Sequence, residues 1–126
     1  MALSVGIDVC DVVRFSEVMA RRPRIVERLF TERERRDTKL KPERLAARFA
    51  AKEATLKTLK VGLGGAAWHD IEVRKLPSGA PCLHLTGRAA ELANSLGLST
   101  FEISLTHTDI SAAAIVVATS EARDAR

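Results

Sequence analysis

The segment from Pro42 to Lys60 constrains the fold of this chain more than any other, because its sequence predicts one long helix. Pro42 suits a first helical turn, where a missing N–H removes no intrahelical hydrogen bond. The interior is rich in Ala, Leu, Lys and Arg, which favour helix. Gly62 follows as a stop signal. This is the most strongly predicted element of the sequence.

The predicted helix, drawn at ~100° per residue, places Glu53, Lys57 and Lys60 inside a broad apolar arc. Two interpretations remain open. Glu53 and Lys57 form an i,i+4 pair that adds a few tenths of a kcal/mol on a solvated face, with lysine stems reaching water. Alternatively, the charges line a cleft in which a carboxylate holds Mg²⁺ and lysines meet phosphate oxygens. The apolar members of the arc are Leu45, Ala46, Phe49, Ala50, Ala54, Leu56, Leu59 and Val61.

The N-terminal residues 3–13 alternate between apolar and small or polar side chains, which predicts a strand. Asp8 lies in the middle of it, on the face of Ser4, Gly6 and Cys10. A polar residue on the wet side of an edge strand would give the same pattern. Asp8 would equally serve as a second oxygen ligand for Mg²⁺, which usually takes one or two protein carboxylates.

The other segments mix strands and helices without regular alternation, which indicates an α+β fold in a single domain over residues 1–126. A short helix over 14–22 is expected to end before Pro23, and Thr31 opens a capping-box helix. Thr86 is expected to cap another helix. The predicted elements after residue 60 are a loop at 62–65, a hairpin of 71–76 and 81–85, a helix over 87–96, and strands over 100–106 and 111–119.

Basic side chains are concentrated in the first half of the chain. Residues 1–60 hold 15 of the 20 Lys and Arg but only 9 of the 16 Asp and Glu, and the second half has an acidic balance. One region is therefore suited to an anionic partner, which would be nucleic acid, a phosphorylated cofactor or an acidic protein.

The sequence predicts a cytoplasmic protein without membrane attachment. No segment approaches the ~20 apolar residues that cross a bilayer. Asp8 and Asp11 interrupt the N-terminal apolar stretch, which is unlike a signal peptide. Cys10 and Cys82 have neither a metal-binding nor a redox spacing, so we expect reduced thiols.

Three blocks of the sequence together resemble the holo-acyl-carrier-protein synthase family, the small phosphopantetheinyl transferases. They are GIDVCDVVRF at 6–15, RFAAKEATLKTL at 48–59 and SLTHT at 104–108. The match runs nearly end to end in the right order, and the helix block with Asp8 upstream and His107 downstream is specific. The departures from the family pattern are Thr58, Thr106 and Ser111, none of which removes a charged group.

The resemblance implies an α+β fold in which a long central helix packs on a mostly antiparallel sheet, assembled as a homotrimer with active sites between subunits. It implies Mg²⁺-dependent transfer of 4′-phosphopantetheine from coenzyme A to a serine of an apo acyl carrier protein. The reaction releases 3′,5′-ADP and would serve fatty acid or polyketide synthesis. Such transfers need positioning and charge neutralisation more than covalent help. Neither nucleic acid nor membrane is expected as a partner.

The resemblance also implies roles for individual residues. Asp8 and Glu53 would bind Mg²⁺, while Lys57 would contact the diphosphate and offset charge on the leaving group. Either Glu53 itself or a metal-bound water that it orients would accept the serine proton. Phosphate contacts are expected from Arg48, Lys57, Lys60, Gly62, Gly64, Gly65, His107 and Thr108. The carrier protein is expected to dock on Arg14, Arg21, Arg22, Arg24 and Arg28.

Three other functions stay open. A nucleic-acid-binding module would explain the basic half, but Tyr is absent and aromatic residues make up only 4% of the chain. A carrier-binding relative without catalysis would not need Asp8, Glu53 and Lys57. A hydrolase of nucleotide diphosphates would differ only in using water as acceptor. Without the resemblance, His107 would be a hydrogen-bonded turn residue and residues 21–44 a solvated face.

Overall fold

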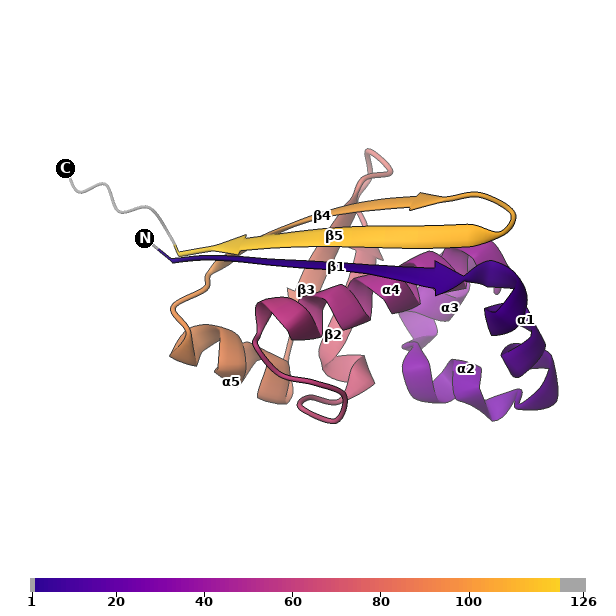
Figure 1. Cartoon of the computed structure of the whole chain (residues 1–126), viewed down its shortest axis with the longest axis horizontal. Coiled ribbons are helices and arrows are strands. Elements are labelled where there is room, and N and C mark those ends of the chain that lie inside the picture. Colours follow the sequence, from indigo (N-terminus) through magenta and orange to yellow (C-terminus); the bar gives the residue numbers. More distant parts are fainter. Residues whose placement is uncertain (1, 121–126) are drawn as a thin grey trace.

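The computed structural model describes residues 2–120, in which helices lie beneath and beside a long sheet (Figure 1). The strands are β1 (Leu3–Asp11), β2 (Ile71–Lys75), β3 (Pro81–Leu85), β4 (Thr100–His107) and β5 (Ser111–Thr119). The helices are α1 (Val12–Arg21), α2 (Arg24–Leu29), α3 (Glu32–Thr38), α4 (Pro42–Thr58) and α5 (Gly87–Ser95), with a short 3-10 helix η1 (Trp68–Asp70). Within the described range, no helix is both long and apolar enough to cross a membrane.

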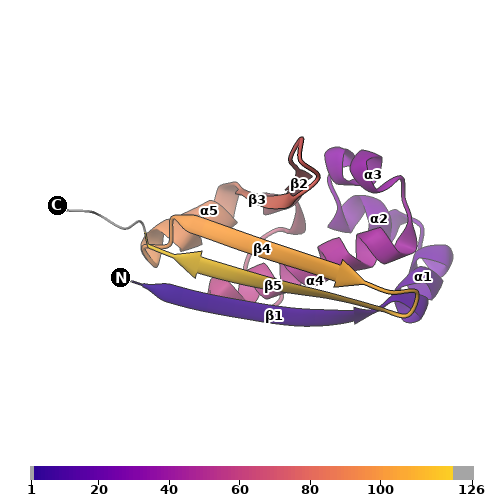
Figure 2. The same ribbon diagram turned by 90° about the horizontal axis from the view of Figure 1, so that it is seen from above.

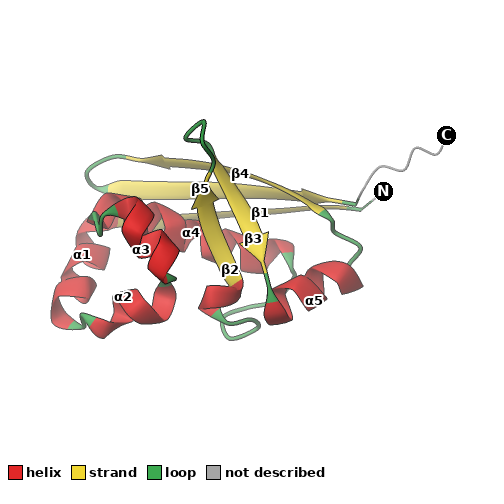
Figure 3. Ribbon diagram, turned by 180° about the vertical axis from the view of Figure 1, so that it is seen from behind, coloured by secondary structure: helices red, strands yellow, loops and turns green. Residues whose placement is uncertain are grey.

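The larger sheet has the order β1-β5-β4 and is antiparallel throughout, while β2 and β3 form a separate antiparallel hairpin. Helix α4 runs beneath the three long strands and contacts all of them (Figure 2). Helices α1, α2 and α3 gather at one end of α4, and α5 lies at the other end (Figure 3). The predicted α+β fold, with a long helix packed on a mostly antiparallel sheet, is confirmed.

Strand β1 packs on α4 through its small and polar side chains. A Cβ atom at Gly6 would collide with the carbonyl oxygen of Ala54, so the strand and the helix approach as closely as glycine allows. Ser4 Oγ donates a hydrogen bond of 2.8 Å to Thr58 O. Asp8 follows on the same face, with its side chain 19% exposed. The face that carries Asp8 is therefore turned to the helix, and its interpretation as the wet side of an edge strand is wrong.

The opposite face of β1 is apolar and exposed. Leu3, Val5, Ile7 and Val9 are 65%, 51%, 60% and 66% exposed, and Ile115 of the neighbouring β5 is 38% exposed. We call these five residues the outer apolar face. Large contiguous apolar patches on a soluble protein mark interaction surfaces.

Two helix boundaries differ from the predicted ones. Helix α1 begins at Val12 because the Asp11 carboxylate accepts a hydrogen bond from Arg14 N and caps it, so β1 ends before residue 13. Helix α4 ends at Thr58, and Lys60 has left-handed backbone angles with φ 62°. Lys60 thus lies beyond the helix, and its predicted position on the apolar arc is wrong.

Helix caps were predicted with mixed success. The Thr31 capping box is confirmed, with Glu34 as its reciprocal partner. Thr86 makes no side-chain cap to α5. The distant Asp70 carboxylate takes that role by accepting from Arg88 N at 3.1 Å, which no local pattern could reveal. Helix α2 was not predicted as a separate element.

Candidate functional site

Three charged side chains meet where β1 crosses α4. Lys57 Nζ lies 3.5 Å from Asp8 Oδ1 and donates a 2.8 Å hydrogen bond to Ile7 O. Glu53 stands one turn before Lys57 and lines the same cavity as Asp8. The three line a space of about 270 Å³, which we call the acidic cavity. Its remaining lining residues are Leu56, Val61, Gly62 and Leu63.

The two carboxylates strongly influence each other. Burial raises the pKa of the Glu53 carboxyl to about 7, hydrogen bonding to Asp8 and the Asp8 charge add to the rise, and Lys57 opposes it. A cation between the carboxylates would relieve their repulsion. In the described part of the chain no third His, Cys, Asp or Glu joins them. This donor set fits Mg²⁺, which completes its octahedron with water and phosphate oxygens.

Glu53→Gln is expected to stabilise the metal-free protein at pH 8. The pKa of Glu53 is raised to about 7, so the folded state holds this proton more tightly than the unfolded state. Proton binding by Glu53 therefore stabilises the folded state fully below its unfolded pKa of 4.5, and this stabilisation is lost as the pH rises through 7. The neutral amide avoids this loss. Thermal melting should show a midpoint raised by a few degrees at pH 8 and little change at pH 5; an equal shift at both pH values would contradict the expectation.

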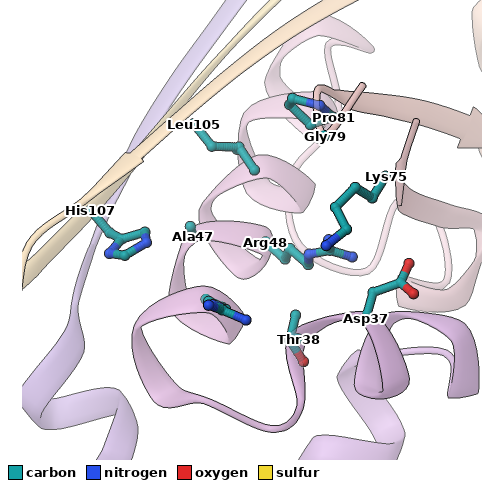
Figure 4. A pocket seen from close by; sticks show the side chains of 10 residues that line it. Asp37, Thr38, Ala47, Arg48, Lys75, Gly79, Pro81, Leu105 and His107 are labelled. Carbon is teal, nitrogen blue, oxygen red and sulfur yellow. The ribbon is translucent and has the colours of Figure 1, made fainter. Parts of the chain in front are cut away.

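A second space, of about 320 Å³, lies between α3, α4, β4 and the β2–β3 hairpin (Figure 4). Arg48 enters it from α4 and His107 from β4, and Arg44 and Lys75 are also part of its lining. Asp37 is the one carboxylate among these lining residues. We call this space the basic cavity. Its excess of cationic side chains suits a phosphate group.

The acidic and basic cavities lie on different sides of α4. Arg48 precedes Glu53 by five positions, which corresponds to a rotation of ~140° and a rise of ~7.5 Å along the helix. The two cavities share no lining residue. Within one chain, the candidate site residues of α4 therefore form two separate groups: Glu53 and Lys57 in the acidic cavity, and Arg48 in the basic cavity.

A third space, of about 360 Å³, meets the acidic cavity at Glu53. Its walls are mostly apolar, with Arg14 among them, and we call it the apolar cavity. Burial raises the pKa of the Cys10 thiol in this wall to about 11, and the charge of Glu53 adds to the rise. Glu53 thus borders a charged space on one side and an apolar one on the other. The other lining residues are Val9, Asp11, Phe15, Val18, Ile25, Leu29 and Phe49.

The arginines predicted to dock a carrier protein are spread over α1, α2 and the turn between them. All are exposed. Within residues 2–120, none of them takes part in an ion pair. They are therefore available to an anionic partner. The five are Arg14, Arg21, Arg22, Arg24 and Arg28, of which the last three line one surface pocket.

Several predicted phosphate contacts lie outside the cavities. Gly62 lines the acidic cavity, whereas Lys60, Gly64 and Gly65 do not. Thr108 uses its hydroxyl in the turn between β4 and β5, where it accepts hydrogen bonds from the amides two and three residues later at 3.2 and 3.1 Å. The structure thus brings together only part of the predicted set.

Sequence reasoning missed two residues of the basic cavity. Arg44 belongs to the segment 21–44, which the sequence alone assigns to a solvated face, and Lys75 lies within the predicted strand 71–76. Neither has a local motif. Both reach the cavity because the hairpin folds back beside α4, so no signal short of the tertiary structure identifies them.

Known proteins match this chain over nearly its whole length. Residues 4–117 match the 4′-phosphopantetheinyl transferase superfamily. The holo-[acyl-carrier-protein] synthase of Beutenbergia cavernae is 47% identical over 118 residues, covering 94% of this chain and 98% of that protein. The Helicobacter pylori holo-[acyl-carrier-protein] synthase in complex with coenzyme A superposes with a TM-score of 0.83 at 30% identity, covering 91% and 99% of the two chains. A Chronobacterium ammoniagenes complex with coenzyme A gives 0.84 at 27% identity, covering 97% and 100%.

Proposed function

The chain belongs to the 4′-phosphopantetheinyl transferase superfamily, and we propose that it transfers 4′-phosphopantetheine from coenzyme A to a serine of an apo acyl carrier protein. The observation that carries the proposal is the meeting of Asp8, Glu53 and Lys57 in one cavity. Residues 1–126 would form one transferase domain. Its setting would be the cytoplasm, in keeping with two free cysteines, and the pathway fatty acid or polyketide synthesis.

The reaction joins the serine oxygen to the pantetheine-side phosphorus and breaks that phosphorus's bond to 3′,5′-ADP. Lys57 would contact the diphosphate and offset charge on the departing nucleotide. Either Glu53 itself or a metal-bound water that it orients would accept the serine proton. Asp8 and Glu53 would together hold Mg²⁺, which when bound supplies Lewis-acid polarisation of the diphosphate.

Coenzyme A carries a second anionic group, the 3′-phosphate, for which the basic cavity is suited. Arg44, Arg48 and Lys75 offer it a cationic lining, and His107 adds an imidazole ring. Because the acidic and basic cavities lie on different sides of α4, one coenzyme A would join the acidic cavity of one subunit to the basic cavity of the next. This arrangement requires an oligomer, and we take it to be a homotrimer with active sites between subunits.

The outer apolar face supports this assembly. Its five large apolar side chains lie together on β1 and β5 and are exposed in the isolated chain. Head-to-tail contacts between copies close into a ring when the rotation allows, and such a ring would give every subunit the same two neighbours. Burial of this face would also add to the stability of a small domain.

The carrier protein would bind at the opposite side of Glu53 from the diphosphate. Five exposed arginines on α1, α2 and their turn suit an acidic partner. The apolar cavity, lined by Arg14, Phe15 and Ile25 among others, would accept an apolar side chain of the carrier next to its acceptor serine. This geometry would place the attacking oxygen opposite the leaving nucleotide, as an in-line displacement requires.

The proposal is tested by weighing the carrier. The protein is mixed with coenzyme A, Mg²⁺ and apo carrier proteins of fatty acid and polyketide type, and each carrier is measured by intact mass spectrometry. A carrier heavier by one phosphopantetheine is expected. Asp8→Ala and Glu53→Ala, and separately EDTA, should reduce the rate by at least about a thousandfold if the carboxylates and the metal act as one unit.

Each rival function predicts a different result in the same experiment. A carrier-binding relative would retain the carrier on a column but add no mass to it. A diphosphate hydrolase would release 3′,5′-ADP from coenzyme A without any carrier. A nucleic-acid-binding module would bind oligonucleotides with an affinity that falls steeply with salt and is indifferent to Asp8→Ala.

A further inference from the structure

A buried ion pair lies behind the basic cavity and links α3, α4, η1 and β2. The side chains of Lys52 and Glu34 are completely buried, with Lys52 Nζ 2.8 Å from Glu34 Oε1. Lys52 Nζ also donates to Trp68 O at 3.0 Å and to Ile71 O. Glu34 accepts a further hydrogen bond from Thr31 N at 3.0 Å. In the described residues every buried side-chain nitrogen and oxygen has a partner, so this network is complete.

The network is connected to the basic cavity by the edge of β2 that, among the residues described, does not pair with another strand. This strand pairs with β3 along one edge. At the other edge, Val73 N donates to Glu34 Oε2 at 2.8 Å, and Val73 O accepts from Arg48 Nη1 at 2.8 Å. The backbone of Val73 therefore connects the buried carboxylate of Glu34 to a guanidinium that lines the basic cavity.

The same connection has an electrostatic part. Burial lowers the pKa of the Arg48 guanidinium, and the nearby Glu34 carboxylate is the largest influence in the opposite direction. Glu34 thus favours the charged form of Arg48. The Lys52 ammonium lies 2.8 Å from the Glu34 carboxylate, and this contact offsets part of the cost of burying the two side chains.

We propose that Glu34 and Lys52 are positioning residues, which hold Arg48 through Val73 in the orientation that receives the 3′-phosphate of coenzyme A. The inference rests on the proposed function. Ordering a long, flexible side chain during binding weakens affinity, and a guanidinium held beforehand by a fixed carbonyl avoids that loss. The pair itself touches no substrate.

Dephospho-coenzyme A, which lacks the 3′-phosphate, is the discriminating probe. The wild-type protein is expected to have a higher kcat/KM with coenzyme A than with dephospho-coenzyme A. The variant Glu34→Gln/Lys52→Met removes both charges and leaves no buried ion unpaired. Its preference for coenzyme A should fall by about tenfold, because one charge-assisted phosphate contact is weakened. We expect KM for coenzyme A to rise while KM for dephospho-coenzyme A changes little.

Val116→Ala is the matched control, because Val116 is fully buried in the large sheet, where it pairs with Gly6 and Ile103 and belongs to neither β2 nor the ion pair. It should lower stability and leave the ratio of the two substrates unchanged. A folded double variant with the wild-type ratio would overturn the positioning role. A wild-type protein that transfers nothing from coenzyme A would instead overturn the proposed function.

Hydrogen exchange on the wild-type protein tests the proposal even where the double variant does not fold. The amide of Val73 is expected to exchange more slowly with saturating coenzyme A than with saturating dephospho-coenzyme A, because only the former engages Arg48. The amide of Val116 should respond equally to both. Equal slowing at Val73 by the two ligands would overturn the proposal.

Discussion

Gly6→Ala is expected to destabilise the protein by about 1–3 kcal/mol and to reduce transfer activity as well. The new Cβ would collide with the carbonyl oxygen of Ala54 and would lie 2.9 Å from the carbonyl carbon and 3.1 Å from Lys57 Cβ. The main obstacle is helix backbone, which cannot rotate away, so β1 must move off α4. Asp8 sits two residues along the same face and would move away from Glu53 with the strand.

Urea unfolding measures the first effect, with Gly62→Ala as the control. Nothing lies within 4 Å of a Cβ built at Gly62, and its φ is not in the left-handed region. That substitution should leave the unfolding midpoint unchanged or raise it slightly, because alanine restricts the unfolded chain. If Gly6→Ala unfolds at the wild-type urea concentration, the close approach of strand and helix is not required for the fold.

Mixing two inactive variants is expected to restore activity. Glu53→Gln damages the acidic cavity, and Arg44→Glu reverses an exposed charge of the basic cavity. If each active site combines the acidic cavity of one subunit with the basic cavity of its neighbour, some sites in a mixed oligomer contain neither change. Random mixing in a ring should recover roughly a quarter of the wild-type rate, measured as carrier mass gain.

The matched control mixes Glu53→Gln with Asp8→Ala. Both changes lie in the acidic cavity, so every site of that mixture has a damaged acidic cavity and should stay inactive. Native mass spectrometry verifies that subunits have exchanged. If Glu53→Gln and Arg44→Glu subunits exchange but the mixed oligomers stay inactive, the site is not shared between subunits. Full activity of Arg44→Glu alone would argue against a role for the basic cavity.

Local signals predicted most of the fold because many of its elements are encoded locally. Helix α4 has Pro42 at its start and a helix-forming interior, and Thr31 forms its capping box with a residue three positions away. The errors arise where a residue distant in the sequence provides a helix cap, or where a residue adopts an unusual backbone conformation. Asp70 caps α5 from eighteen positions earlier, and Lys60 adopts a left-handed conformation that its residue type does not favour.

The site was predictable residue by residue but not as an arrangement. Alternation placed Asp8 on the face of Gly6, yet only the close contact of β1 with α4 shows that this face meets Glu53. The family resemblance named Arg48 as a phosphate contact, but it could not show that Arg48 donates a hydrogen bond to the backbone of Val73. The sequence pattern predicts which residues share a face of a strand or helix, but only the tertiary structure shows which residues each face contacts.

The thiol in the apolar wall has a consequence for redox chemistry. Coenzyme A and the product carrier both end in a thiol, so oxidised forms of either would expose the protein to disulfide exchange. Exchange proceeds through the thiolate, and the pKa of Cys10 is raised to about 11 by burial and by the surrounding carboxylates. At neutral pH this cysteine stays protonated. Burial and the carboxylates that border this thiol would thereby keep it inert toward the sulfur of the proposed substrate.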